Sequence, residues 1–335
     1  MNQALRLAVV GVGYFGALHA EKLARLPGAV LVAVVDRDMA RAQAVAETHG
    51  VEALDDPAAL IGRVDAAIVA VPTRAHFEVA ALLLENGIHV LIEKPITDDE
   101  AAARRLIELA AAKNLVLQVG HLERFSAVGQ ALRNRVHDAI YIESYRIAPF
   151  GGRGTDVGVI LDLMIHDIDL ILTFVRAPIE SVEAIGIPVL SASEDVVNTR
   201  VRFANGCFAT MTASRVSFKK ERKMRIFQPE AYTGIDFLER TLRNVYKKEG
   251  AAPGGLPQVA FENESYEELD ALYEEDKAFV EAIATGTPPL VSGEDGLRAL
   301  EAATLIMQSL KENLDRFAAA RGLAAFPKVE ARRGS

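Results

Sequence analysis

Residues 5–38, LRLAVVGVGYFGALHAEKLARLPGAVLVAVVDRD, decide the fold that this sequence predicts. The apolar run 5–10 predicts a strand that is buried on both faces. Three glycines follow it, then a helical pattern over 17–26 and a second apolar run over 29–35 that ends at Asp36. Strand, glycine turn, helix, strand and acid in this order predict one half of a doubly wound, nucleotide-binding sheet.

Each glycine of the turn has a separate predicted task. Gly11 permits the tight turn, Gly13 lets the main chain approach a pyrophosphate, and Gly16 lets the helix lie close to the strand. The helix N-terminus behind them offers unpaired N–H groups and about half a positive charge to an anion. We expect Tyr14 and Phe15, which lie between the glycines, to contact the cofactor as well. The alternative is a glycine turn that binds nothing.

The acid at the end of the second strand bears on the choice of cofactor. Asp36 falls twenty residues after Gly16, where a carboxylate can accept hydrogen bonds from both ribose hydroxyls of an adenosine. A 2′-phosphate has a charge of about −1.5 to −2, and one like-charge pair about 4 Å apart costs up to about 4 kcal/mol near a protein surface. We therefore expect NAD rather than NADP as the cofactor. Arg37 leaves NADP open, because it could bind a phosphate if Asp36 turned away.

Composition and charge limit the class of protein. The chain has 335 residues, 50% hydrophobic and 25% charged, which predicts two ordinary globular domains. A formal net charge of −9 argues against nucleic acid or an anionic membrane as a partner. The longest apolar stretch, 157–175, contains four ionisable residues, so it is not expected to span a membrane. The single Cys207 is expected to be a packed residue rather than a nucleophile. Because the sequence shows no basic leader, we expect a cytoplasmic protein.

Strands and helices alternate through the first part of the chain, which predicts a Rossmann-type doubly wound parallel sheet with ligands at the carboxyl ends of its strands. We assign residues 1–121 to this NAD-binding domain. Thr97 and Glu100 have the spacing of a capping box, with Thr97 as N-cap. The expected strands are 5–10, 29–35, 50–54, 65–71, 89–93 and 115–119, and the expected helices are 17–26, 39–49, 74–85 and 97–113.

The pattern changes after residue 121, because strands now follow one another without crossover helices. The turn 204–206 joins two of them as a hairpin. Residues 122–335 therefore predict an α+β domain with a mostly antiparallel open sheet. The second face of such a sheet must meet solvent or another subunit, so we expect a homodimer or homotetramer formed through it. The expected strands are 139–147, 181–187, 199–203 and 207–217, the helices are 127–137, 157–174, 266–284 and 294–317, and 251–258 is expected to be a loop.

A basic segment, residues 215–225 (RVSFKKERKMR), allows two interpretations. One is a solvated edge strand whose lysines prevent pairing with other chains. The other is a patch that lies near phosphates of the substrate.

Two further groups of residues contain side chains that could act chemically. Glu93-Lys94-Pro95 follows an expected strand, where a nicotinamide would lie, although a lysine at a strand end is often only solvated. Asp162, His166 and Asp169 are spaced to share one face of an apolar helix. A buried charge costs several kcal/mol unless it is paired or used, so the alternative is an internally satisfied Asp–His pair. The same three residues could also supply metal ligands, but we expect no metal, because the chain has no Cys cluster and no second His at a ligand spacing.

The glycine turn, Glu93-Lys94-Pro95 and the Asp162-x-x-x-His166 helix, in this order, resemble the Gfo/Idh/MocA oxidoreductases over nearly the whole chain. The segments 72–76 (PTRAH) and 119–125 (VGHLERF) support the resemblance. It implies transfer of a hydride between a carbon of a sugar or polyol and the nicotinamide. The cofactor contacts that it implies beyond the glycine turn and Asp36 are Pro72, Thr73, His76, Glu93, Lys94 and His121.

The resemblance also implies that Lys94, Asp162 and His166 hold and deprotonate the reacting hydroxyl. A histidine titrates near about pH 6.5 and a lysine near about pH 10.4, so histidine is the better base at neutral pH. We assign His166 as general base, Lys94 as the donor that polarises the substrate oxygen, and Asp162 as the group that orients the sugar or His166. The alternative in which Lys94 is the base stays open.

Residues 152–157 (GRGTDV) and 226–232 (IFQPEAY) resemble the branch of this family that acts on UDP-N-acetylhexosamines. This branch oxidises the C3 hydroxyl of the sugar. Arg153, Lys219 and Lys220 would suit a diphosphate, and Arg124 is a further expected substrate contact. The alternatives are a dehydrogenase of a free polyol or aldose, such as an inositol, and a non-catalytic NAD-binding protein.

Overall fold

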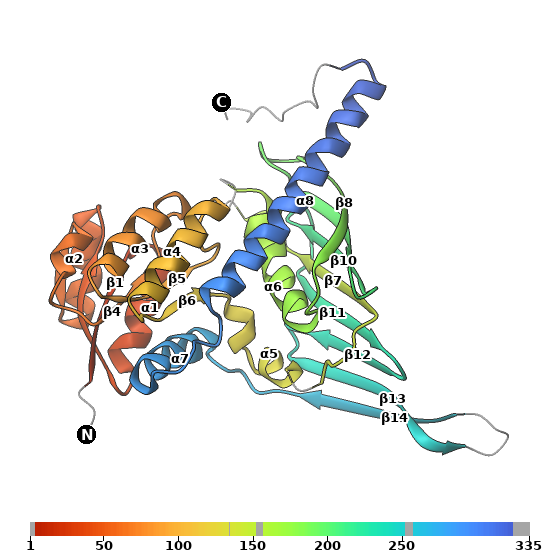
Figure 1. The fold of residues 1–335 in the computed structure, drawn as a ribbon, viewed down its shortest axis with the longest axis horizontal. Coiled ribbons are helices and arrows are strands. Elements are labelled where there is room, and N and C mark those ends of the chain that lie inside the picture. Colours follow the sequence, from red (N-terminus) through yellow and green to blue (C-terminus); the bar gives the residue numbers. More distant parts are fainter. Residues whose placement is uncertain (1–3, 134, 152–156, 252–256, 324–335) are drawn as a thin grey trace. The chain divides into compact units, whose positions relative to one another are not determined.

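The computed structural model describes residues 4–133, 135–151, 157–251 and 257–323. The chain forms two compact units (Figure 1), Met1–Ser126 with Leu269–Leu300, and Ala127–Glu268 with Glu301–Ser335. This division differs from the two continuous domains expected from the sequence, because residues 269–300 return to the first unit. None of the described helices combines the length and the apolar character needed to cross a membrane.

The first unit contains one parallel sheet, with the strand order β3-β2-β1-β4-β5-β6. This is the order of a doubly wound sheet that reverses between β1 and β4, and it confirms the predicted fold class. The strands are β1 (Leu5–Val10), β2 (Ala29–Val35), β3 (Glu52–Leu54), β4 (Ala66–Val69), β5 (His89–Glu93) and β6 (Leu117–Gly120).

Helices connect these strands, and α1 packs against α2 while α3 packs against α4. The end of α2 follows the chemistry of its residues, since Gly50 takes the left-handed conformation (φ +67°) that ends a helix. The connecting helices are α1 (Tyr14–Arg25), α2 (Met39–His49), η1 (Pro57–Leu60), η2 (Thr73–Ala75), α3 (His76–Glu85), α4 (Glu100–Ala112) and η3 (Leu122–Phe125).

The predicted N-cap of α4 is wrong by two residues. The Asp99 carboxylate accepts a hydrogen bond from the main-chain N–H of Ala102 (2.9 Å), and Asp99 is therefore the cap. The hydroxyl of Thr97 donates instead to the main-chain oxygen of Asp99 (2.6 Å). Aspartate and threonine are both good caps, and the sequence alone did not separate them.

Helix α7 (Ala271–Thr285) and the start of α8 (Gly293–Ala320) belong to the first unit, although they lie far along the chain. Phe279 and Val280 of α7 are buried in the same apolar cluster as Leu7 of β1 and Leu23 of α1. Burial of these side chains explains why α7 packs on the nucleotide-binding fold rather than on the second unit.

The second unit contains an eight-stranded sheet in the order β14-β13-β12-β11-β7-β10-β9-β8. All of its pairs are antiparallel except β10 with β7, which confirms the predicted mostly antiparallel sheet. The sequence did not predict β12, β13 or β14, and the loop expected over 251–258 overlaps the start of β14. The strands are β7 (Tyr141–Ile147), β8 (Ile179–Ile187), β9 (Val196–Phe203), β10 (Phe208–Ser214), β11 (Glu221–Gln228), β12 (Ala231–Asp236), β13 (Thr241–Ala251) and β14 (Pro257–Ser265).

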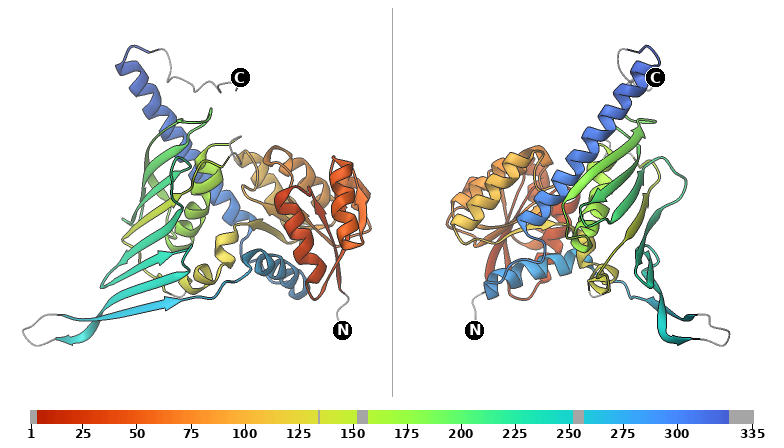
Figure 2. Two further views of the ribbon diagram at one scale, coloured as in Figure 1. Left: turned by 180° about the vertical axis from the view of Figure 1, so that it is seen from behind. Right: turned by 45° about the vertical axis from the view of Figure 1, so that its right-hand side comes forward.

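Helices α5 (Ala127–Leu132) and α6 (Ile165–Phe174) and the later part of α8 belong to this unit, and α6 lies against the sheet (Figure 2). A buried ion pair holds α6 to β7, because Nη2 of Arg146 lies 2.8 Å from Oδ1 of Asp167. The amide of Asn313 in α8 donates to the main-chain oxygen of Ala184 in β8 (2.8 Å). The segment before α6 is a π-helix, η4 (Ile160–Met164), where the sequence predicted one regular helix over 157–174.

Candidate active site

The glycine turn after β1 has the geometry that its sequence predicts. Gly11 has a φ of +86°, and a Cβ on it would lie 2.7 Å from the main chain of Ala70. A Cβ on Gly16 would lie 1.8 Å from the main-chain oxygen of Gly11, so α1 can start here only without a side chain. A Cβ on Gly13 would meet nothing within 4 Å, which leaves open space beside the main chain for a ligand.

The N-terminus of α1 is open to an anion. Its N-cap is Gly13, which provides no side-chain cap, and its first turn contains no acidic residue. Tyr14 is 61% exposed and Phe15 is 45% exposed, and their rings meet edge to face. The helix N-terminus, the open space beside Gly13 and the exposed aromatic rings together fit the diphosphate of a dinucleotide.

Asp36, directly after β2, faces this turn. Its carboxylate accepts hydrogen bonds from the main-chain N–H groups of Val12 (3.0 Å) and Asp38 (2.9 Å). Nη1 of Arg41, on α2, lies 3.3 Å from the Asp36 carboxylate, whereas the predicted cation Arg37 is exposed. The sequence therefore missed Arg41, which α2 directs back toward the strand end.

The turns after β4 and β5 are tied together by His76. Its ring is buried, with Nδ1 2.8 Å from the main-chain oxygen of Pro95 and Nε2 2.8 Å from that of Val71. Burial lowers the pKa of His76 below the ordinary value. Both ring nitrogens thus face the protein, while Pro72 is exposed and Thr73 is half-buried beside them. Direct contact of these residues with the cofactor stays a prediction.

Lys94 lies at the carboxyl end of β5, where the sequence predicted it. Its side chain is half-buried, and its main-chain N–H donates to Oε2 of Glu93 (3.2 Å). The other carboxylate oxygen of Glu93 lies 3.0 Å from Nε2 of His19. Glu93 is therefore held inside the unit, and its predicted contact with the cofactor stays a prediction.

His121 and Arg124 follow β6, and both are buried. The main-chain oxygen of His121 accepts a hydrogen bond from the N–H of Arg124 (3.1 Å). Nη1 of Arg124 lies 3.5 Å from the carboxylate of Asp295 at the start of α8. This ion pair gives Arg124 a structural partner within the first unit, and a contact with substrate stays a prediction.

Asp162 and His166 belong to the second unit, and both are half-buried, whereas Asp169 is 1% exposed. Asp162 lies in η4 and His166 in α6. Hydrogen bonds in a π-helix join residues five apart, so the regular spacing assumed from the sequence applies only from Ile165 onward. Such π-helical turns are frequent at functional sites.

Residues far along the chain hold the start of η4. The main-chain oxygen of Glu194 accepts from the N–H of Val159 (3.2 Å), and the guanidinium of Arg215 donates to the oxygen of Val157 (2.9 Å). Arg215 is itself buried, with Nε 2.6 Å from the buried carboxylate of Asp195. These contacts fix the helix that presents Asp162, and none of them was predicted.

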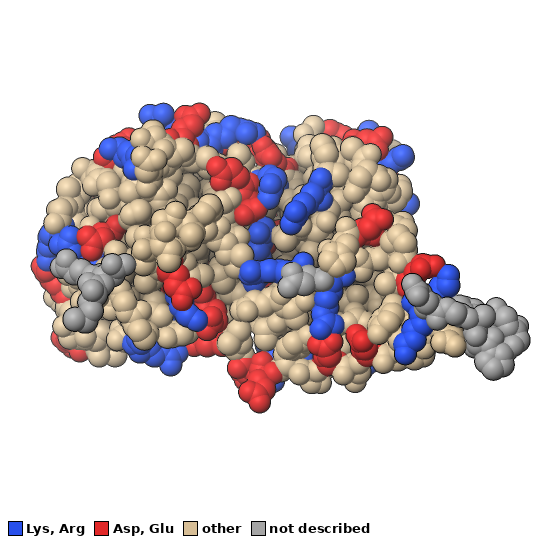
Figure 3. Space-filling view, turned by 60° about the horizontal axis from the view of Figure 1, so that its bottom comes forward, with Lys and Arg blue, Asp and Glu red and all other residues tan. Residues whose placement is uncertain are grey.

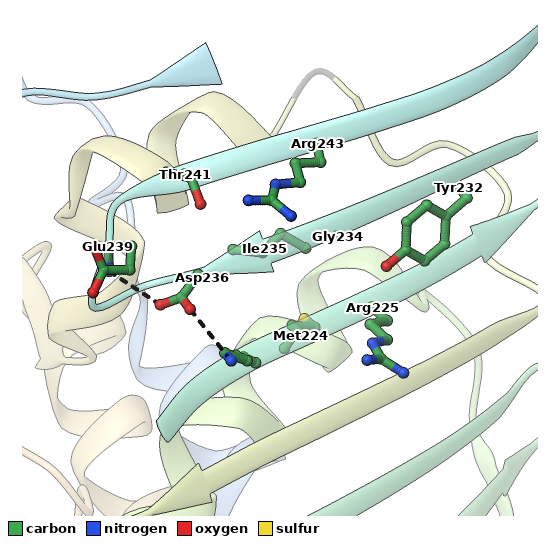
Figure 4. Close-up of a pocket in the computed structure, with 10 residues that line it drawn as sticks. Met224, Arg225, Tyr232, Gly234, Ile235, Asp236, Glu239, Thr241 and Arg243 are labelled. Atoms are coloured by element: carbon green, nitrogen blue, oxygen red, sulfur yellow. Dashed lines mark hydrogen bonds and ion pairs between the residues drawn. The ribbon is translucent and has the colours of Figure 1, made fainter. Parts of the chain in front are cut away.

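The basic segment 215–225 does not form an edge strand, so that prediction is wrong. Strand β11 lies between β7 and β12, inside the sheet, and Arg215 is buried. Lys219 and Lys220 are exposed, and a role near phosphates stays a prediction. A pocket of about 340 Å³ lies on β11, β12 and β13 (Figure 4). Lys223 is one of its lining residues, with Nζ 3.7 Å from Oδ2 of Asp236. Arg153 lies outside the described residues.

Charge is mixed over the surface. The face in Figure 3 shows acidic and basic side chains interspersed, although the formal net charge is −9.

Two family models match this chain. The model described as oxidoreductase family, NAD-binding Rossmann fold, matches residues 5–121, and the GFO/IDH/MocA C-terminal domain model matches residues 130–231. The chain belongs to the Gfo/Idh/MocA family of oxidoreductases. Membership of this family confirms the predicted resemblance and the predicted enzyme class, and it confirms a Rossmann unit that binds NAD.

Relatives within the family are similar over nearly the whole chain. UDP-N-acetylglucosamine 3-dehydrogenase of Acidithiobacillus ferrooxidans is 37% identical over 93% of this chain and 99% of its own. A solved structure of that enzyme has a TM-score of 0.85 at 36% identity, and the match covers 91% of this chain and 97% of the other. Myo-inositol 2-dehydrogenase of Thermotoga maritima is 28% identical over 92% of this chain and 97% of its own.

The sequence also missed a group of buried ionisable residues near Lys94, namely His19, Glu275 and Asp276. The sequence contains a pattern that could have indicated these residues. The buried positions of α7 follow a helical repeat, and two of these positions are acidic rather than apolar. His19 likewise lies on the buried face of α1 with Ala20 and Leu23.

Proposed function

We propose that this protein is an NAD-dependent dehydrogenase that oxidises the C3 hydroxyl of a UDP-N-acetylhexosamine, with UDP-N-acetylglucosamine as the substrate. The observation that carries the proposal is the 37% identity, over 93% of the chain, to an enzyme named for that reaction. The presence of Lys94, Asp162 and His166 in the family's motif order supports a catalytic protein.

The residues around the glycine turn fit NAD. The N–H groups at the start of α1 would hold the diphosphate, and the carboxylate of Asp36 would accept the ribose hydroxyls. When bound, NAD accepts the hydride that leaves the substrate carbon. Asp36 opposes a 2′-phosphate, so we propose NAD rather than NADP as the physiological cofactor.

A substitution at Asp36 tests this preference. Asp36→Ser removes the carboxylate and leaves Arg41 as a cation beside the turn. We expect the ratio of kcat/KM for NAD to that for NADP to fall about tenfold to a hundredfold. The double variant Asp36→Ser/Arg41→Ala should lose most of the gained NADP activity. An unchanged ratio in Asp36→Ser would contradict the proposed role of Asp36.

We propose that Lys94, Asp162 and His166 act on the reacting hydroxyl. His166 accepts the proton, because imidazole is largely neutral near pH 7, and Lys94 donates a hydrogen bond to the substrate oxygen as negative charge develops on it. Asp162 orients the sugar or His166. The assignment comes from the family motifs, and the alternative with Lys94 as the base remains open.

Replacement of Lys94 tests its part. Lys94→Ala should lower kcat about a hundredfold to ten-thousandfold and leave NAD affinity within a few-fold. Lys113→Ala is the control, because Lys113 is exposed at the end of α4. Activity that survived Lys94→Ala would show that Lys94 is not a catalytic residue.

The substrate is tested by reduced-nicotinamide absorbance with NAD and UDP-N-acetylglucosamine, beside myo-inositol and glucose. A signal with the UDP-sugar alone supports the proposal. A ketone trap belongs in each assay, because a 3-oxo product can lie uphill. A signal with myo-inositol alone would favour the second candidate, a polyol dehydrogenase, which the 28% identity to the Thermotoga enzyme supports.

We also propose a homodimer or homotetramer formed through the open face of the second sheet. Tyr141 and Phe227 stack on that face, Phe227 contacts Tyr232, and Tyr145 is 36% exposed. Partly exposed aromatic side chains of this kind favour protein contacts. Light scattering after gel filtration tests the proposal, and a monomer would contradict it. A cytoplasmic location likewise remains a proposal, which fractionation of the cells would test.

A further inference from the structure

Four ionisable side chains come together inside the first unit behind the end of β5. His19 comes from α1, Glu93 from β5, and Glu275 and Asp276 from α7. His19, Glu275 and Asp276 are fully buried, and the side chain of Glu93 is 14% exposed. We call these four residues the buried cluster. Three of them have no part in the function proposed above.

A chain of contacts links Asp276 to Lys94. Nδ1 of His19 lies 2.7 Å from Oδ1 of Asp276, and Nε2 lies 3.0 Å from Oε1 of Glu93. The other oxygen of Glu93 accepts the main-chain N–H of Lys94 (3.2 Å). Both ring nitrogens of His19 thus face carboxylate oxygens at hydrogen-bond distance, which is the arrangement of an imidazolium that donates from both sides.

The pKa shifts of His19 and Glu93 agree with this geometry, whereas burial raises the pKa of Asp276 and the contact with His19 opposes that rise. Burial alone would lower the pKa of His19, but Asp276 and Glu93 outweigh burial and raise it well above the ordinary value. Burial would raise the pKa of Glu93, yet the contact with His19, together with the charge and main-chain N–H of Lys94, outweighs burial and lowers that pKa. His19 is therefore charged, and Glu93 is an ionised acceptor.

Glu275 differs from the other three residues. Neither oxygen of its carboxyl group has a hydrogen-bond partner among the described residues. The group points into the cluster, since a carboxyl oxygen of Glu275 lies within 4.8 Å of the facing atoms of His19 and Glu93. An ionised carboxylate that is buried without partners is strongly disfavoured, so either a proton or a cation must neutralise it.

The geometry favours the proton. One histidine and two carboxylates are donors that a divalent transition metal accepts. A metal, however, needs a lone pair on a ring nitrogen of His19, and both nitrogens face carboxylate oxygens that accept their protons. With Glu275 neutral, the buried cluster holds no ionised carboxylate at Glu275 that lacks a partner.

We propose that Asp276, His19 and Glu93 are positioning residues that fix the main chain of Lys94, and that Glu275 completes their buried cluster as a neutral acid. The proposal rests on the proposed catalytic role of Lys94. Asp276 keeps His19 protonated, His19 holds one oxygen of Glu93, and the other oxygen holds Lys94 at the end of β5.

The protonation of Glu275 is tested by Glu275→Gln, which mimics the neutral acid. Burial is the largest cause that raises the pKa of Glu275 well above the ordinary value, and repulsion from Glu93 adds to it, while His19 opposes it. Asp276 also raises it from the same helix. The element η3 also packs against α7, and its charged residue Arg124 has its guanidinium 3.5 Å from the carboxylate of Asp295.

The sign of the expected effect follows from this raised pKa. A glutamate with a raised pKa stabilises the folded state fully below its unfolded value of about 4.3, and this stability is lost as pH rises toward the folded pKa. From about pH 5 upward, the folding equilibrium constant of the wild type should therefore fall about tenfold per pH unit relative to that of Glu275→Gln. The advantage of Glu275→Gln in Tm should grow as pH rises from about pH 5 toward the raised folded pKa of Glu275.

Glu274→Gln is the matched control, because Glu274 is the preceding residue of α7 and its side chain is 25% exposed beside Lys277. Its Tm difference from the wild type should not change with pH. A constant difference for Glu275→Gln as well would overturn the neutral acid. One equivalent of tightly bound metal in the purified protein, with a lower Tm after chelation, would also overturn it.

The positioning role is tested by Asp276→Asn, with Asp270→Asn as control at the N-cap of the same helix. Asp276→Asn should lower kcat about tenfold or more while KM for NAD stays within about twofold. Asp276→Glu should restore part of the loss, and Asp270→Asn should leave kcat unchanged, because asparagine keeps the N-cap. Equal kcat in the wild type and Asp276→Asn, or equal losses in both variants, would overturn the positioning role.

A second readout needs no substrate. The rate at which an amine-selective reagent modifies Lys94, followed by mass spectrometry, should differ severalfold between the wild type and Asp276→Asn. It should be the same in the wild type and Asp270→Asn. If the wild type fails to oxidise any sugar, the proposed function fails while this labelling still decides the positioning role. An unchanged labelling rate in Asp276→Asn would overturn that role.

Discussion

The glycine turn of the first unit and the η4–α6 segment of the second unit are held in place in different ways. The first contains the candidate cofactor-binding glycines, and the second contains Asp162 and His166. The turn is built from contacts between main-chain atoms and absent side chains, as at Gly16, where a Cβ would lie 1.8 Å from the oxygen of Gly11. The start of η4 is held by charged side chains from distant residues, as in the contact of Arg215 with Val157, 58 residues away. Steric exclusion shapes one region, and buried charge shapes the other.

This difference predicts that the two regions are sensitive to different kinds of substitution. A Cβ added at a glycine such as Gly16 should disrupt the turn, because the main-chain atoms that it would meet cannot move far. Removing a charge should break the η4 region, because a buried partner is then left unpaired. The following predictions test this contrast.

The largest expected effect is at Arg215. Arg215→Ala leaves the buried carboxylate of Asp195 without its guanidinium and should lower the free energy of unfolding of the second unit by about 3–5 kcal/mol. The chain has no tryptophan, so urea unfolding is best followed by circular dichroism. NAD affinity should stay within twofold, because the glycine turn belongs to the other unit.

Lys219→Ala is the control for Arg215→Ala, because Lys219 belongs to the same segment but is exposed. Its effect should stay within about 0.5 kcal/mol. Equal urea midpoints for the two variants would show that the Arg215–Asp195 pair does not stabilise this region.

The next effect is at the glycine turn. Gly16→Ala should destabilise the first unit by about 3 kcal/mol and lower NAD affinity about a hundredfold, equivalent to about 2.8 kcal/mol. Gly13→Ala should also lower NAD affinity but should leave stability nearly unchanged, because its Cβ would meet nothing within 4 Å. Calorimetric titration with NAD and thermal unfolding of both variants measure this. Equal losses of stability would contradict separate tasks for the two glycines.

The sequence predicted the first region almost completely, for a physical reason. The tasks of Gly11 and Gly16 follow from local rules on positive φ and on close packing of a helix on a strand. The parallel strand order was predictable because strands alternated with helices. The family motif placed Lys94 at the end of β5, where the structure has it.

The misses share one cause, which is dependence on residues distant in sequence. No local pattern indicates that α7 returns to the first unit, that Arg41 approaches Asp36, or that β11 has a neighbour on both sides. The expected edge strand is an example. Lysines and arginines along a strand indicate one exposed face, and they do not tell whether both edges of the strand are paired.

A moderate effect is expected at Gly158, where η4 meets Glu194. A Cβ on Gly158 would lie within 1.7 Å of the Glu194 carboxylate, so Gly158→Ala should destabilise the second unit by about 1–3 kcal/mol. Because the obstacle is the end of a side chain, Gly158→Ala/Glu194→Ala should recover part of that loss relative to Glu194→Ala alone. A double-mutant cycle by urea unfolding measures the coupling. A coupling near zero would show that Glu194 moves aside freely.

The smallest effect concerns the N-cap of α4, where the two interpretations are a cap at Asp99 and a capping box at Thr97. If Asp99 is the cap, Asp99→Ala should cost about 1 kcal/mol, and Asp99→Asn should cost much less, because asparagine caps equally well. In a capping box at Thr97, the side chain of Glu100 would instead reach back to the N–H of Thr97. The structure places Glu100 3.8 Å from Arg104, so Glu100→Ala should cost less than about 0.5 kcal/mol. Urea unfolding of the three variants separates the two, and a larger loss for Glu100→Ala than for Asp99→Ala would restore the capping box.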